Sequence, residues 1–191
     1  MESPLRIESF EGLGRAKQEI IGQTEVGRFE ASGMLTSEQV AAYLRTELPL
    51  SHLDGCPSIF YEPTAPQFSN SSTLAFFTIA SHEIKIGPVE RFEDAEDMLG
   101  TIVHEVGHNV HENIINQHPD LAAAWEHIHG GKFAEIFGDG FVSDYARTNQ
   151  YEDFAETYRV YVRDPELLQV INPEKYNFMY NYVFGGREYP Q

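Results

Sequence analysis

The chain has 191 residues, enough for one well-packed domain and short for two. Its 13 basic and 30 acidic residues give a formal net charge of -17, a field that repels nucleic acid and anionic membranes. Basic peptides fit this charge better, although acidity that only maintains solubility explains it equally well. Cys56 is the single cysteine, so a metal site would depend on His, Glu or Asp, and no apolar run is long enough for a membrane span.

The first 50 residues are predicted to be mainly helical. The clearest helix is TSEQVAAYLRTEL, with Thr36 or Ser37 as its N-cap. An extended region follows, from PSIFYEP to TLAFFTIASHEIKIG. In its last part Ile84 and Ile86 alternate with charged residues, which predicts a half-exposed strand with one face packed.

The second half of the chain is predicted to be mostly helical. An apolar stripe runs from about Phe92 to the residue before Pro119, and acidic residues enrich its first turn. Further helices are expected in PDLAAAWEHIH, EDFAETYRVYV and NPEKYNFMYNYVF. There is no repeat and no low-complexity linker. We therefore expect one α+β domain over residues 1–191, with an N-terminal lobe at about 1–112 and a helical C-terminal lobe at about 113–191.

The motif HEVGH, residues 104–108, places two histidines one helical turn apart. On a helix, His104 and His108 lie on one face and can both reach a single zinc ion at about 2.0 to 2.1 Å. Glu105 points beside such an ion, where it can take a proton from a zinc-bound water. His111 continues the same face, but it lies roughly 10 Å from His104 along the axis, so we expect it outside the ligand set, either in contact with a ligand residue or facing solvent.

The third ligand must come from farther along the chain. Glu126 lies 18 residues after His108 and is more simply explained as an exposed charge on a short helix, and Glu135 is a weaker candidate. Glu152 and Glu156 share one helical face at i and i+4, so one could bind the ion while the other accepts a hydrogen bond from a ligand histidine. A solvated acidic face explains this pair equally well. From spacing alone the choice stays open.

The segment SDYARTNQYEDFAETYR, residues 143–159, resembles the zinc-helix region of the anthrax lethal factor catalytic domain and its relatives, including the bacterial Pro-Pro endopeptidases. Together with HEVGH, the resemblance covers about residues 99–163. It implies a zincin-like α+β fold of the gluzincin type, with a small mixed sheet and a mostly helical C-terminal lobe. It also implies that His104, His108 and Glu152 bind one Zn²⁺ and that Glu105 is the general base. Tyr145 would then stabilise the tetrahedral intermediate, and Glu156 would contact a ligand histidine.

The resemblance implies a zinc endopeptidase that acts on peptide or protein substrates and is secreted or delivered to a host cell. We expect a monomer, and the net charge of -17 favours substrates with basic residues flanking the cleaved bond. Two alternatives are a toxin docking domain of the same fold that lacks catalysis, and a zinc amidase acting on a non-peptide amide. Because the chain keeps all five residues of the expected site, the docking alternative is less favoured. The strand around SHEIKIG, which precedes the HEVGH helix, is expected to be the edge strand that pairs with extended substrate.

Overall fold

A five-stranded mixed sheet and a set of helices make up this α+β protein. The computed structural model describes residues 18–69, 72–129 and 140–188. The sheet has the order β1-β2-β3-β5-β4, in which β2, β3 and β5 run parallel and the two outer strands pair antiparallel with their neighbours. Its strands are β1 (Gln18–Ile21), β2 (Thr24–Gly27), β3 (Ser58–Tyr61), β4 (Ala75–Thr78) and β5 (Glu83–Ile86).

The prediction that the first 50 residues are mainly helical was wrong for the described part before residue 28. There β1 and β2 form a hairpin whose two-residue turn contains Gly22 at φ 60, a backbone conformation that glycine adopts without steric cost. Helix α1 (Ser37–Glu47) does form where it was expected. Thr36 is its N-cap and shares a reciprocal capping box with Gln39.

The predicted strand in SHEIKIG exists as β5, but it is not an edge strand. It lies between β3 and β4 in the sheet, and Ile84 and Ile86 are fully buried. The edge is β4, which precedes β5 in the chain and pairs with it from Ala75 opposite Ile86 to Thr78 opposite Glu83. Sequence periodicity identifies the buried face of a strand, but it cannot tell which strand ends up at the edge, because pairing is decided by the tertiary fold.

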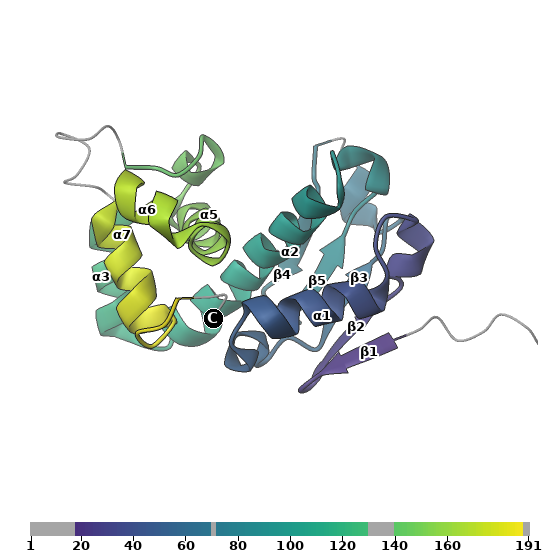
Figure 1. Cartoon of the computed structure of the whole chain (residues 1–191), viewed down its shortest axis with the longest axis horizontal. Helices are drawn as coiled ribbons and strands as arrows, with labels where there is room; N and C mark the ends of the chain where they lie inside the picture. The colour runs from purple at the N-terminus through teal and green to yellow at the C-terminus, as the bar shows by residue number, and fades with distance from the viewer. Residues whose placement is uncertain (1–17, 70–71, 130–139, 189–191) are drawn as a thin grey trace, which may run out of the picture.

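The long helix α2 (Ala95–Val110) lies between the sheet and the other helices, with α1 and the strands on one side of it (Figure 1). Asp94 caps it, and a π-helical segment at His111–Ile115 continues it. On the other side lie α3 (Pro119–His129), α5 (Gln150–Arg163), α6 (Pro165–Ile171) and α7 (Pro173–Phe178), the last followed by a π-helical segment at Met179–Val183. Helix α6 was not predicted, whereas α3 and α5 match their predicted segments closely.

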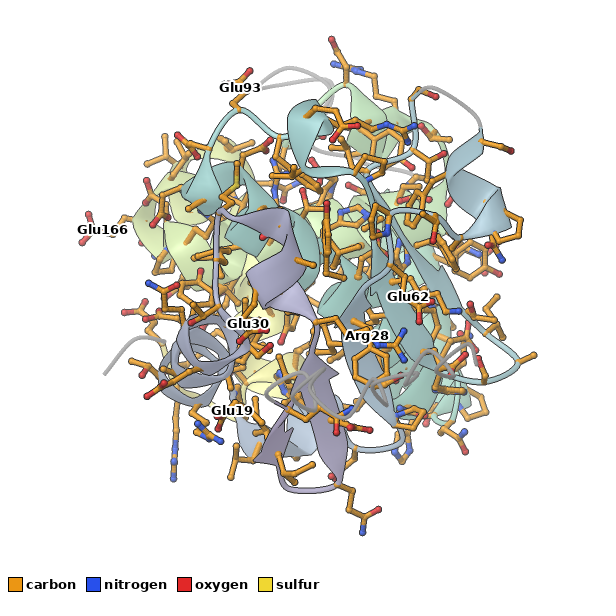
Figure 2. The ribbon with its side chains drawn as sticks, turned by 90° about the vertical axis from the view of Figure 1, so that its right-hand side faces the viewer. Glu19, Arg28, Glu30, Glu62, Glu93 and Glu166 are labelled. Carbon is orange, nitrogen blue, oxygen red and sulfur yellow. The ribbon has the colours of Figure 1, made fainter. Side chains whose placement is uncertain are left out.

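Acidic side chains lie on several parts of the surface. In Figure 2 the labelled Glu93 and Glu166 lie at separate edges of the molecule, Glu19 lies in its lower part, and Glu62 lies beside Arg28. Lys85 also pairs with Glu62, at 2.8 Å. Within the described ranges, no helix is both long enough and apolar enough to cross a bilayer.

Candidate metal centre

Helices α2 and α5 cross closely, and this contact brings the predicted site together. The two helices run in opposite directions, because Gly100 lies against Arg163 whereas Gly107 lies against Ala155. A Cβ atom added at Gly107 would be only 3.0 Å from the Ala155 Cα atom, which is backbone and cannot rotate away. The glycine inside HEVGH therefore permits the close approach of α5 that positions Glu152 beside the two histidines.

Three donor atoms lie at nearly equal distances from one another. His104 Nε2 is 3.1 Å from Glu152 Oε2. His108 Nε2 is 3.2 Å from His104 Nε2 and 3.2 Å from Glu152 Oε2. In a tetrahedral zinc site with bonds of 2.0 to 2.1 Å, ligand atoms are about 3.3 Å apart. The triangle formed by His104, His108 and Glu152 thus has the size that one such ion requires, and these residues form the potential metal site of the described chain.

Glu156 orients His104. Its Oε1 atom lies 2.9 Å from His104 Nδ1, which is placed to donate, and its Oε2 atom accepts a hydrogen bond of 2.7 Å from Ser143. A proton on Nδ1 leaves the lone pair of Nε2 directed at the triangle. Burial alone would lower the pKa of His104, but the hydrogen bonds to Glu152 and Glu156 outweigh burial and raise this pKa to about 9. The carboxylates therefore stabilise positive charge at this place.

Glu105 is buried beside the triangle, with 6% of its surface exposed. Burial raises the pKa of its carboxyl group, while the nearby His104 and His108 lower it to a smaller extent. The backbone N–H of Phe77 in the edge strand β4 lies near this carboxylate and also lowers its pKa. A carboxyl group with a raised pKa, held next to a metal site, is suited to accept and return a proton.

Tyr145 lies on the approach to α5, in the short 3₁₀ helix Tyr145–Arg147, and its ring centroid is 5.8 Å from that of His104. The side chain is half-exposed, and its hydroxyl lies close to the Glu152 carboxylate. Burial, followed by the negative charges of Glu152 and Glu105, raises the pKa of Tyr145 to about 12. The phenol therefore keeps its proton near neutral pH and remains a hydrogen-bond donor.

His111 lies outside the triangle, as expected. It is buried, so the alternative expectation, that it faces solvent, was wrong. Only 4% of its surface is accessible, and its ring packs edge-on against Tyr151 and Phe154, each with centroids 5.0 Å away. Burial, together with the nearby His108, lowers its pKa to about 4, so the ring is neutral. Glu126 on α3 is not part of the triangle either. Glu135 lies outside the described residues.

An open cleft passes over the triangle and is walled on one side by β4. Thr73, Ala75 and Phe77 line it opposite His104, Glu105 and Tyr145. The Gly87 N–H group donates a hydrogen bond to the Leu74 carbonyl group, so the next pair along the two strands, Ala75 and Ile86, is a non-hydrogen-bonded pair. Because hydrogen-bonded and non-hydrogen-bonded pairs alternate, the N–H groups of Ala75 and Phe77 point away from β5. One of these groups already reaches Glu105, so the free edge of the strand faces the cleft.

The fold and site define an α+β domain in which a two-histidine helix and a carboxylate from a second helix can hold one metal ion. Residues 32–182 match the family described as anthrax toxin lethal factor, N- and C-terminal domain. Because the match covers most of the chain, the protein belongs to this family. No curated protein and no solved structure matches the chain.

The sequence did not indicate three contributors to the site. The β4 edge was missed because TLAFFT lacks the polar alternation that marks a half-exposed strand. Ser143, which holds Glu156, lies two residues before Tyr145, and a small hydroxyl side chain in a loop gives no distinct signal. Arg159, which lines the cleft beyond Glu156, lies in the segment that resembles the zinc-helix region, but neither its spacing nor the resemblance indicated a role for it.

Proposed function

We propose that this protein is a zinc-dependent endopeptidase. The observation that carries the proposal is the triangle of His104, His108 and Glu152 donor atoms, 3.1 to 3.2 Å apart, with the buried Glu105 beside it. Two imidazole nitrogens and one carboxylate oxygen are the ligand set of many catalytic zinc sites, and no cysteine is present at the triangle to favour a structural site. Three protein ligands leave a fourth position for water or substrate.

A zinc ion held in this way supplies a water molecule with a pKa near 7 and polarises a substrate carbonyl group. Glu105 accepts the proton of the attacking water and returns it to the amine that leaves, a contribution of about 10² to 10⁴ in rate. Tyr145 donates a hydrogen bond to the oxyanion that develops on the carbonyl carbon. Glu156 and Ser143 keep His104 in the required tautomer.

The substrate is proposed to be an extended peptide segment that adds to the free edge of β4. The Ala75 N–H group faces the cleft, whereas the Phe76 N–H group points toward β5, since Phe76 and Lys85 form a hydrogen-bonded pair. Ala75→Pro should therefore raise KM severalfold while leaving the sheet intact. Phe76→Pro is the matched comparison and should instead lower stability. Equal KM values for wild type and Ala75→Pro would refute substrate addition at this edge.

The catalytic proposal is tested with a peptide library incubated with the zinc-loaded protein, beside Glu105→Gln and Glu152→Gln. The first variant should bind zinc and lose cleavage by at least 10²-fold. The second should lose zinc, measured by metal analysis after gel filtration. Cleavage that persists in Glu105→Gln or in the presence of a chelator would overturn the proposal.

The location and the class of substrate are also part of the proposal. Membership in a toxin family supports a protein that is secreted or delivered to another cell. The net charge of -17 supports basic segments near the cleaved bond. A non-catalytic docking role has less support, because a docking surface requires neither a base nor a metal triangle.

A further inference from the structure

The cleft extends along α2 to both sides of the metal triangle, and its two ends differ in charge. Thr101 and Arg159 line the end near the start of α2, together with Ser72 and Thr73 of the opposite wall. Glu112 lines the other end, beyond His108 and beside Ile79. From Thr101 to Glu112 the helical rise of 1.5 Å per residue gives about 16 Å. An extended peptide of about five residues spans this length at 3.3 Å per residue.

Arg159 is the one lysine or arginine among the described residues that line the cleft. Its side chain is 34% exposed, and its Nε atom lies 3.6 Å from Glu156 Oε1. This is a loose contact to a carboxylate that already has hydrogen bonds from His104 and Ser143. The guanidinium group carries five N–H donors in a planar fork, so it keeps donors for a further carboxylate.

The opposite end of the cleft is anionic. Glu112 accepts a hydrogen bond of 3.0 Å from Asn116, a neutral donor that leaves the carboxylate its full charge. A negative side chain of a substrate would be repelled there and attracted at Arg159. The contrast is local, because the charge of the whole chain, -17, disfavours acidic peptides in general.

The direction of β4 determines which half of a bound peptide lies at each end of the cleft. The N-terminal part of the strand wall, residues 72–75, lies at the Arg159 end, and Phe77 and Ile79 lie at the Glu112 end. A peptide that pairs antiparallel with β4, the commoner and more stable arrangement, has its C-terminal half beside Arg159. The metal triangle lies between the two ends, so Arg159 falls two or three residues after the bond above the triangle.

We propose that Arg159 determines substrate specificity by binding an acidic side chain at the second or third residue after the cleaved bond. The proposal rests on the endopeptidase function proposed above and names a substrate class for it, namely peptides with Asp or Glu on the C-terminal side of the cleaved bond. Arg159 forms a charge-assisted hydrogen bond with this side chain. At the other end of the cleft, Glu112 repels an acidic side chain that lies before the cleaved bond.

The test uses a neutral peptide that the zinc-loaded protein cleaves, with Glu or Gln placed two or three residues after the cleaved bond. Glu should be preferred over Gln by about tenfold in kcat/KM, mainly through KM, and the preference should shrink in high salt. The same Glu placed before the cleaved bond should lower kcat/KM. A Glu-to-Gln ratio near one at both positions after the bond would overturn the proposal, and so would a preference for Glu only before the bond.

Variants separate binding by Arg159 from its contact with Glu156. Arg159→Gln should abolish the Glu preference, Arg159→Lys should retain part of it, and Arg159→Glu should prefer Lys in the same peptide position. Arg163→Gln is the matched control, because Arg163 lies one turn later and pairs with Glu96 outside the cleft, so it should keep the ratio of wild type. If no peptide is cleaved at all, the endopeptidase function fails; if peptides are cleaved without the Glu preference, only the role of Arg159 fails.

Discussion

Substitution of Asp153 tests the buried charge pair that anchors the start of α5. Asp153 and Lys175 are 0% and 1% exposed, and their side chains are 2.6 Å apart. Asp153 also accepts a hydrogen bond from His129 at 3.0 Å, and the Lys175 ammonium lies 4.7 Å from the centre of the Phe141 ring. Burial lowers the pKa of Lys175, and the negative charge of Asp153 opposes this shift.

Asp153→Asn removes the charge that compensates Lys175 and leaves an ammonium group in a site closed to water. Removing one partner of such a pair costs about 3 to 5 kcal/mol of unfolding free energy. For a domain of this size, 1 kcal/mol corresponds to about 2 to 4 °C in melting temperature, so the midpoint should fall by roughly 10 °C. Urea and thermal denaturation, followed by circular dichroism, measure the change.

Two further variants make this result decisive. Asp144→Asn is the matched control, because Asp144 is fully exposed and the same substitution should change stability by less than about 0.5 kcal/mol. The double variant Asp153→Leu/Lys175→Met removes both charges and should recover most of the loss. A cost below about 1 kcal/mol for Asp153→Asn would refute the argument that the pair is desolvated.

Three other predictions concern the metal, the packing of the two site helices and pH. Zinc at 1,000 times its dissociation constant should raise the unfolding free energy by about 4 kcal/mol, measured in a melting experiment. A chelator or Glu152→Gln should remove this stabilisation. If zinc raised the melting temperature of Glu152→Gln as much as that of wild type, Glu152 would be excluded as a ligand. Gly107→Ala should lower stability by about 1 to 3 kcal/mol in urea denaturation, because the added methyl group meets the Ala155 backbone; unchanged stability would contradict the close helix crossing. Burial lowers the pKa of His52 to about 4, so on acidification the unfolded chain binds a proton at this side chain before the folded protein does. The neutral buried His52 therefore contributes about 3 kcal/mol to the unfolding free energy above pH 6.5, and this contribution is lost as pH falls toward 4. His52→Gln should flatten the fall of unfolding free energy over that interval, and an unchanged slope would count against a neutral buried His52.

Local sequence determined those parts of the protein that depend on residues close together in the chain. An amphipathic helix with histidines one turn apart follows from HEVGH and its flanking apolar residues, and α2 forms there. The rise along the helix axis also excluded His111 from the ligand set, and the structure places it against Tyr151 and Phe154. Spacing left the third ligand open between Glu152 and other glutamates, and the family resemblance implied Glu152.

The tertiary structure alone decided which strand borders the cleft and which distant groups meet there. SHEIKIG shows a clear alternation, yet β5 is interior and β4 is the edge, because strand order depends on pairing between segments and each strand encodes only its own buried face. Likewise, Asp153 gives no sign in the sequence that its partner is Lys175, 22 residues away on another helix. Short-range periodicity and capping act within a few residues, whereas the cleft, its charged ends and the buried ion pair arise only when helices and strands pack against one another.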